Sequence, residues 1–327
     1  MKVIIFSHES DIDGIGSIIL GKLAFGNIDF ELLPNPKPLE LKFREYINNK
    51  KIYDYDKIFI TDLALDNPSL DIVSKDDILK ERVKVFDHHE RAIELGLNKY
   101  NFTFIEEEDS NGIKRCGTEI FYKYLVDNDY LKRNESLDKF VEFTRLEDTW
   151  DWKRKGIVEA HDLAILFNNI GINKYIELII NKLSKEEFSF TKEEKELINN
   201  IKETDLNNIK NYLSKAEYFI DEDGNKFGIT FSPYKYRNDL PEYVRNNNIN
   251  NVKYFITVSL DKDKYGQKSY RSVDKSCDVN KIAMKYNGGG HPCSAGVSIT
   301  KEQNMKIKSL SSKEALEYIS KCKYENI

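Results

Sequence analysis

Near the N-terminus, residues 3–25 read VIIFSHESDIDGIGSIILGKLAF. The run Val3–Phe6 is short and apolar, as expected of a buried strand. The sequence from Gly16 to Phe25 has helical character, and Gly26 follows where helices commonly end in a left-handed glycine. A strand, a polar loop and a helix in this order predict the first unit of an α/β fold.

The same alternation continues through the first 110 residues or so. Four further β-rich runs occur at Ile28–Leu33, Lys57–Thr61, Val83–Phe86 and Phe102–Ile105. Strands that alternate with helices predict a mostly parallel sheet covered on both faces. The pattern then becomes helical from Gly117 to about Ile180. Strands return at Phe227–Phe231, Tyr254–Leu260, Ser269–Val273 and Ala295–Ile299, so we expect a second, smaller α/β domain.

A chain of 327 residues is long for one hydrophobic core. The stretch 184–214 is rich in Lys, Glu and Asn and has few apolar positions, which indicates an exposed helix or linker. We therefore predict a first domain over 1–183, a helical linker over 184–214 and a second domain over 215–327.

Charge is unevenly distributed over a chain whose net charge is −5. From Lys215 onward there are 19 Lys and Arg against 14 Asp and Glu, so the first 214 residues carry −10. An acidic half is suited to hold metal ions and a basic half to hold phosphate, although two solvated surfaces explain the numbers equally well. The four cysteines are scattered without a CxxC pair, which favours reduced thiols over a thiolate zinc site.

The N-terminal apolar run is far too short for a signal peptide or a membrane span. No other apolar stretch is long enough either. We therefore expect a cytoplasmic protein without a membrane partner.

Histidine is scarce, and the first one stands in a loop directly after the first strand. His8, Asp11 and Asp13 fall within six residues at the strand's carboxyl end, the edge where open α/β sheets bind ligands. Asp11 and Asp13 can face different ions if two metals lie about 3.5–4 Å apart. Turn and helix-cap chemistry is the alternative interpretation of the two aspartates.

Two later strands end in residues of the same kind. Asp62 follows KIFIT, and Asp87-His88-His89 follows VKVF. Of two adjacent histidines, one can bind a metal and the other can contact the substrate phosphate. Asp87 can orient one of the imidazoles by a hydrogen bond. Taken alone, Asp62 is better explained as a helix cap, because capping aspartates are common in loops between strands and helices.

A fourth motif, Glu147-Asp148-Thr149-Trp150-Asp151-Trp152, ends a helical segment. One of its carboxylates can complete a metal site, but spacing does not decide which. His161 follows on an amphipathic helix away from the motifs, and we expect it to be structural or on the surface.

A fifth motif, Asn287-Gly288-Gly289-Gly290-His291, lies downstream of Arg271. Three glycines can present successive N–H groups as an anion-binding nest, and Arg271 and His291 can add charged donors. A flexible hinge explains the glycines but not the neighbouring His and Arg.

These five motifs, taken in order, resemble those of the DHH phosphoesterase superfamily, with Asp87-His88-His89 as the Asp-His-His motif. The stretch from Arg271 through Gly288-Gly289-Gly290-His291 to Gly296 is similar to the associated DHHA1 domain. Within the superfamily the chain is most similar to the oligoribonuclease (nano-RNase) NrnB type. The resemblance implies an α/β fold with an N-terminal DHH domain and a smaller C-terminal DHHA1 domain.

The resemblance also implies a set of roles. His8, Asp11 and Asp62 would hold one metal, and Asp13, bridging Asp62, His88 and Asp148 the other. His89, oriented by Asp87, would contact the phosphate together with Arg271, the glycines Gly288, Gly289 and Gly290, and His291. Oxygen ligands with a few imidazoles suit two Mn²⁺, or Mg²⁺, better than a thiolate-preferring ion.

The expected activity is two-metal hydrolysis of short RNA of about two to five nucleotides to 5′-mononucleotides, as a 3′–5′ exonuclease. The expected partner is short single-stranded RNA or a dinucleotide, and a homodimer is compatible with the sequence. Alternatives are a 3′-phosphoadenosine 5′-phosphate phosphatase and a phosphodiesterase for linear or cyclic dinucleotides. A catalytically silent nucleotide-binding module is the alternative outside the enzymes, and it predicts a missing ligand.

Overall fold

The computed structural model describes residues 1–185, 187–260 and 266–323. The chain forms two compact units, Met1–Ile198 and Asn199–Ile327. A separate linker over 184–214 stays a prediction, and residues 186, 261–265 and 324–327 of the predicted domains lie outside the described residues.

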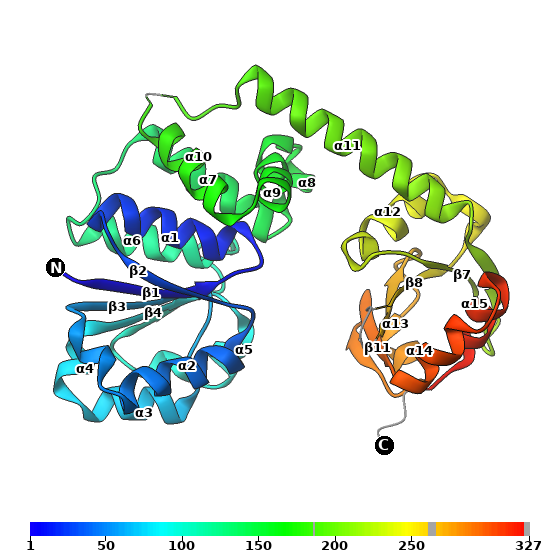
Figure 1. Cartoon of the computed structure of the whole chain (residues 1–327), viewed down its shortest axis with the longest axis horizontal. Helices are drawn as coiled ribbons and strands as arrows, with labels where there is room; N and C mark the ends of the chain where they lie inside the picture. Colours follow the sequence, from blue (N-terminus) through cyan, green and yellow to red (C-terminus); the bar gives the residue numbers. More distant parts are fainter. Residues whose placement is uncertain (186, 261–265, 324–327) are drawn as a thin grey trace. The chain divides into compact units, whose positions relative to one another are not determined.

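The first unit is built on a five-stranded sheet in which all neighbours are parallel (Figure 1). Its spatial order is β2-β1-β3-β4-β5. The strands are β1 (Val3–His8), β2 (Asp29–Leu33), β3 (Lys57–Thr61), β4 (Val83–Asp87) and β5 (Thr103–Ile105). All five predicted strands are present, and the expectation of a mostly parallel sheet is confirmed.

Helices cover both faces of this sheet because alternate strand residues point to opposite sides. Ile5 of β1 packs with Phe59 and Phe86 under α1 (Ile12–Phe25) and α6 (Gly117–Asp127). Phe6, one residue on, packs on the other face with α2 (Pro36–Asn48) and α3 (Asn67–Lys75). The remaining helices of the second layer are α4 (Asp77–Arg82) and α5 (Glu90–Glu94), with short η1 (Lys51–Asp54) and η2 (Leu97–Lys99).

A helical layer thickens the first face. It consists of α7 (Glu135–Asp148), α8 (Asp151–Lys155), α9 (Val158–Ile170) and α10 (Ile172–Leu183). These helices confirm the predicted helical region after Gly117. The long helix α11 (Lys192–Leu213) starts in the first unit and ends in the second.

The second unit contains a six-stranded sheet of order β10-β11-β9-β8-β7-β6. Only β7 and β8 are parallel among its described neighbours. The strands are β6 (Glu217–Ile220), β7 (Lys226–Phe231), β8 (Tyr254–Leu260), β9 (Gly266–Ser272), β10 (Gly289–His291) and β11 (Ser294–Ile299). Of these strands, β6 and β10 are not predicted from the sequence.

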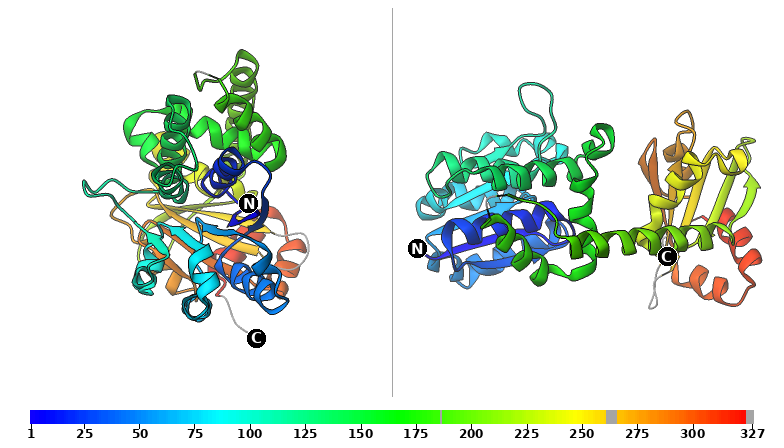
Figure 2. Two further views of the ribbon diagram at one scale, coloured as in Figure 1. Left: turned by 90° about the vertical axis from the view of Figure 1, so that its left-hand side faces the viewer. Right: turned by 90° about the horizontal axis from the view of Figure 1, so that it is seen from above.

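The two faces of this second sheet have different covers. One face packs against α13 (Val279–Met284), α14 (Lys301–Lys308) and α15 (Ser312–Lys321) (Figure 2). On the other face lie the end of α11 and α12 (Asp239–Asn246), with η3 (Tyr234–Arg237) and η4 (Ile249–Asn251) nearby. Among the described residues, no helix is long and apolar enough to cross a membrane.

The glycine motif differs from the predicted nest. The N–H of Gly288 already donates to the carbonyl of Ala283 at 2.9 Å. Gly289, Gly290 and His291 form β10, which pairs antiparallel with β11. A nest of three free glycine N–H groups is therefore absent from the described structure, because hairpin pairing and the preceding helix turn engage this backbone.

Candidate metal centre and active site

Three neighbouring parallel strands bring the first three motifs to one edge of the N-terminal sheet. β1 ends at His8, β3 is followed by Asp62, and β4 ends at Asp87. The register pairs Ser7 with Thr61 and Thr61 with Phe86, so the strand ends are aligned. Residues more than 50 positions apart thus converge at the carboxyl edge of the sheet.

Two carboxylates and one backbone carbonyl surround the imidazole of His8. Its Nδ1 lies 2.7 Å from Asp11 Oδ2 and 3.6 Å from Asp62 Oδ2. Its Nε2 lies 3.1 Å from the carbonyl of Pro34, which restricts the ring. Asp11 also caps α1 by accepting the Gly14 N–H, so the helix start holds this carboxylate in place.

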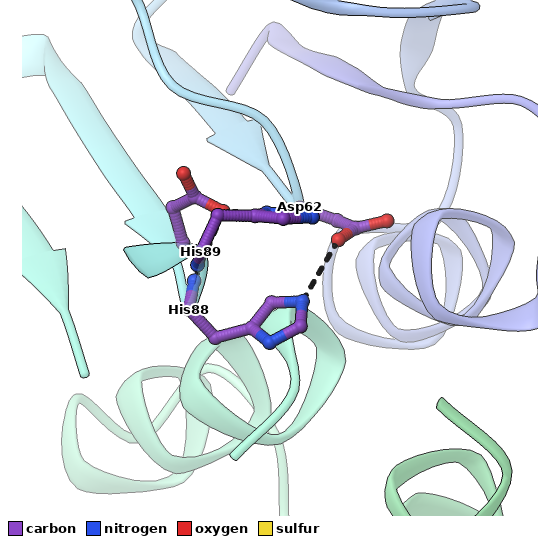
Figure 3. Close-up of side chains that lie close together, drawn as sticks. Asp62, His88 and His89 are labelled. Atoms are coloured by element: carbon purple, nitrogen blue, oxygen red, sulfur yellow. Dashed lines mark hydrogen bonds and ion pairs between the residues drawn. The ribbon is translucent and has the colours of Figure 1, made fainter. Parts of the chain in front are cut away.

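A second group surrounds His88. Its Nε2 lies 3.3 Å from Asp62 Oδ1, an approach visible in Figure 3. The same nitrogen lies 3.7 Å from Asp13 Oδ2 and 3.7 Å from Asp148 Oδ2. Asp148 is the last residue of α7, whereas Glu147 contacts His161 and Asp151 contacts arginines instead.

Asp62 belongs to both groups through its two oxygens. Oδ2 faces His8 and Oδ1 faces His88. The residue is 2% exposed and has a positive φ of 56°, a conformation that costs a non-glycine residue on the order of 1–3 kcal/mol. Its N–H donates to Phe86 on the adjacent strand, which fixes the turn that aims the carboxylate.

Asp87 and His89 form a pair beside the cluster. Asp87 Oδ1 lies 2.7 Å from His89 Nδ1 and accepts the N–H of His88 at 2.9 Å. Asp87 is buried, but the His89 side chain is 54% exposed. A buried carboxylate thus orients an imidazole that remains accessible to a ligand.

Sequence reasoning missed the residues that hold Asp13. The N–H groups of Gly117 and Thr118, at the start of α6, each donate to the Asp13 carboxylate at 2.7 Å. A Cβ at Gly117 would lie 2.8 Å from the backbone of Asp62, so only glycine fits. The available signal was a glycine at a predicted helix start, which alone does not indicate a partner 104 residues away.

Crowding of buried carboxylates dominates the electrostatics of the cluster. Burial and the charge of Asp13 raise the pKa of both Asp62 and Asp148 well above the ordinary value. The hydrogen bond to Asp11 raises the pKa of His8, and the hydrogen bond to Asp87 raises that of His89. Although burial lowers the pKa of His88, the nearby carboxylates raise it overall. A positive charge among these carboxylates would relieve their repulsion.

The donor set fits divalent cations. Asp62 Oδ2 and His88 Nε2 are buried and lack a hydrogen-bond partner among the described residues, although buried polar atoms are normally satisfied. Ligand atoms of His8, Asp11 and Asp62, and those of Asp13, His88 and Asp148, lie within 4.8 Å of one another in each group. Asp62, Asp87, His88 and His89 form a further group. Carboxylates with imidazoles suit Mn²⁺ or Mg²⁺.

The predicted phosphate-binding residues lie in the second unit. His291 of β10 and Arg271 of β9 both pair with Ser294 of the intervening strand β11. Residues directly opposite across neighbouring strands share a face, so the His291 and Arg271 side chains lie on the same face. The structure thus places both residues on one face of the second sheet, with β11 between them.

The prediction that His161 lies away from the motifs is wrong. Its Nδ1 is 3.1 Å from both oxygens of Glu147, and its ring stacks on Trp152 with centroids 4.5 Å apart. Helix α9 packs against α7 and α8, which the sequence did not reveal. Trp152 is therefore a packing residue of the wall behind the fourth motif.

Comparison with known proteins assigns the family. The DHH family, N-terminal domain, matches residues 2–144, and the DHHA1 domain matches residues 238–317. Oligoribonuclease NrnB of Bacillus subtilis (strain 168) is 30% identical over 306 residues, which are 91% of this chain and 73% of that protein. The chain belongs to the DHH family. As a DHH-family protein it is a hydrolase that acts on phosphoester bonds, and the family is metal-dependent.

Two solved structures share the fold. The pGpG-specific phosphodiesterase PggH of Vibrio cholerae is 13% identical with a TM-score of 0.54, covering 98% of this chain and 99% of that one. The DHH domain of a member of the s1p family of ribosomal proteins is 13% identical with a TM-score of 0.55, covering 99% and 87%. At these identities the likeness shows the DHH fold alone.

Proposed function

We propose that this DHH phosphoesterase degrades short oligoribonucleotides, of about two to five nucleotides, to 5′-mononucleotides. The observation that carries the proposal is the bridging position of Asp62 between two groups of metal ligands. The similarity to a protein named oligoribonuclease, over 91% of the chain, supports RNA as the substrate. Release from the 3′ end is part of the proposal.

In this proposal two divalent cations, Mn²⁺ foremost, occupy the cluster. His8, Asp11 and Asp62 would hold one ion, and Asp13, Asp62, His88 and Asp148 would hold the other. Cations in such a site supply Lewis acidity and lower the pKa of water towards neutrality. No Ser or Cys nucleophile is then required. Cys116, the cysteine beside Asp13, is buried, and burial raises the pKa of its thiol well above the ordinary value.

The chain's own side chains orient the reacting phosphate. Asp87 occupies Nδ1 of His89, so Nε2 of this half-exposed side chain is the nitrogen left to meet a phosphoryl oxygen. Gly117 and Thr118 hold Asp13 by both oxygens, which keeps its position while charge changes at the site. Arg271 and His291 supply positive and hydrogen-bonding groups to the phosphate backbone of the substrate.

A timed digestion tests the proposal. The substrates are 5′-labelled RNAs of two to about twenty-four nucleotides, with Mn²⁺, with Mg²⁺ or with a chelator. Parallel reactions contain 3′-phosphoadenosine 5′-phosphate and a linear and a cyclic dinucleotide. We expect fast, metal-dependent conversion of the shortest RNAs to mononucleotides, and the fate of the label reports the direction.

The other outcomes separate the alternatives. Preference for 3′-phosphoadenosine 5′-phosphate or a cyclic dinucleotide would replace the RNA substrate. Equal rates on long structured RNA would contradict a short-substrate enzyme. No turnover with Mn²⁺ present would favour a silent nucleotide-binding module, although the ligand set of such a module is expected to be incomplete.

A further inference from the structure

The second unit contains a pocket of about 740 Å³, and none of the candidate metal ligands lines it. It lies at the end of β7 and β8 and at the start of β9, and Tyr212 of α11 and Tyr234 of η3 also line it. Its volume is within the range of small-molecule sites. Two aromatic rings beside polar strand ends suit a planar ligand that carries hydrogen-bonding groups.

A buried hydroxyl lines this pocket without a partner. Ser232 is 7% exposed, and its Oγ forms no hydrogen bond among the described residues. Its backbone is anchored, because its N–H donates to Val258 and its carbonyl accepts from Ser259 Oγ. An unsatisfied buried hydroxyl is costly, on the order of 1–3 kcal/mol, so a ligand that bonds to it would gain from its position. The side chain of Gln267, also in the lining, offers both a donor and an acceptor.

Positive charge stands beside the aromatic wall. The guanidinium of Arg237 lies 4.0 Å from the ring centroid of Tyr234. Arg271 donates from Nε to Asn238 Oδ1, and burial and the charge of Arg237 lower its pKa. Within the described residues neither guanidinium forms an ion pair with a carboxylate. Two unneutralised arginines near each other favour an anion such as phosphate.

We propose that this pocket binds the nucleobase of a nucleotide, with Arg237, whose guanidinium lies against Tyr234, taking its phosphate. The base stacks on Tyr234 and bonds to Ser232 and Gln267. The bound nucleotide is one end of the oligonucleotide substrate, an assignment that rests on the proposed function. A free mononucleotide has the same chemistry, and the experiment distinguishes the two sources.

Binding is measured by calorimetry in the presence of a chelator, so that no turnover occurs. The probes are AMP and ribose 5-phosphate, which share the phosphate but not the base. We expect the native protein to prefer AMP by about tenfold, from stacking on one aromatic ring. Tyr234→Ala should remove this preference, whereas Arg237→Gln should lower the affinity for AMP and for ribose 5-phosphate by the same factor. Tyr234 is 48% exposed, so its truncation should leave the fold intact.

The control is Ile220→Ala, a truncation of a 72% exposed side chain in the same unit but outside the pocket, and it should change neither affinity. Equal affinity of the native protein for AMP and ribose 5-phosphate would overturn the proposal. So would an undiminished AMP preference in Tyr234→Ala. Because these readouts need no catalysis, they stand even if the native enzyme fails to cleave RNA.

Kinetics with a diadenosine dinucleotide and Mn²⁺ then locate the pocket in the reaction. Tyr234→Ala should raise KM about tenfold and leave kcat within a factor of two, because stacking contributes to binding and not to the chemical step. An unchanged KM, together with weakened AMP binding, would refute the substrate assignment and leave a site for free mononucleotide.

Discussion

Asp62 shows how much a single side chain contributes to this site. Its carboxylate stands between two imidazoles, buried, unsatisfied at Oδ2 and held in a left-handed backbone conformation. Strained and unsatisfied residues cluster at functional sites because the surrounding structure keeps them there. At the scale of one residue, the chemistry therefore depends on both Asp62 oxygens being available.

Asp62→Asn replaces one of these oxygens by an amide. We expect kcat/KM for a dinucleotide to fall by at least about 100-fold. Mutation of a residue that only hydrogen-bonds to a metal ligand already lowers metal affinity or activity by about 10–100-fold. Metal content measured on the purified variant should fall from two ions per chain. Glu81→Gln, on the exposed face of α4, is the matched control, and it should keep the native rate. Native metal content in Asp62→Asn would contradict the bridging role.

At the scale of elements, the site is formed by the carboxyl ends of strands and the N-termini of helices. The N-terminus of α6 donates two N–H groups to Asp13, and α1 and α6 pack closely because Gly16 leaves room for Thr118. An N-terminal helix dipole favours a carboxylate at this place. The position of Asp13 thus depends on the contact between two helices as well as on its own loop.

Gly117→Ala should disturb this contact. The added Cβ would lie 2.8 Å from the Asp62 backbone, and we expect a loss of about 1–3 kcal/mol in unfolding free energy together with reduced activity. Denaturant titration and dinucleotide kinetics measure the two effects. Gly96→Ala is the control, because its φ of 64° strains an alanine although no atom lies within 4 Å of the new Cβ. That variant should lose stability but keep its activity once folded.

Lys268 joins β9 to the end of α15 in the second unit. It is 1% exposed, and its Nζ donates to the carbonyls of Ile319 and Cys322. Burial lowers the pKa of Lys268 to about 8. A cation bonded to the last carbonyls of a helix is favourable. Capping therefore favours the charged form of Lys268, whereas burial favours its neutral form.

A lowered lysine pKa makes stability depend on pH. Between pH 8 and 10.5 the unfolded chain holds a proton on Lys268 that the folded chain has lost, so this residue's contribution to stability rises with pH. The quantity to compare is the difference in unfolding free energy between the native protein and Lys268→Met. We expect this difference to increase by on the order of 3 kcal/mol across the window. Denaturant titrations from pH 7 to 10 measure the difference. A constant difference would show that the pKa is not lowered.

At the scale of the whole molecule, the metal ligands and the predicted phosphate-binding residues belong to different units. His8 through Asp148 lie in Met1–Ile198, whereas Arg271 and His291 lie in Asn199–Ile327. The first 214 residues carry −10 and the remainder +5. From this division of charge we expect the acidic unit to hold cations and the basic unit to hold phosphate.

Metal binding should therefore stabilise one unit selectively. A ligand at about 100 times its Kd adds about 2.7 kcal/mol to the stability of the unit that binds it. In scanning calorimetry with Mn²⁺, we expect the transition of the first unit to move up and that of the second to stay. Asp148→Asn should reduce the shift. An equal shift of both transitions would show that metal acts on the chain as a whole.

Local sequence was sufficient for most of the strands and for the family. Apolar runs such as KIFIT fold as strands because short β-branched stretches bounded by polar loops have few alternatives, and ligand-type residues recurred at three strand ends. Those recurrences, with the resemblance to the DHH family, identified the candidate ligands. β10 was not predicted because glycine has low strand propensity, and β6 is a run of only four residues at the edge of the sheet.

Tertiary structure decided which of these residues meet. Pairing of β1 with β3 and of β3 with β4 aligned His8, Asp62 and Asp87, and the packing of α7 brought Asp148, not Glu147 or Asp151, to His88. The contacts of Gly117 with Asp13, of His161 with Trp152 and of Tyr234 with Arg237 depend in the same way on packing or on a turn. Periodicity and spacing describe residues that are close along the chain. This site consists of side chains that are distant along the chain and become neighbours only when the chain folds.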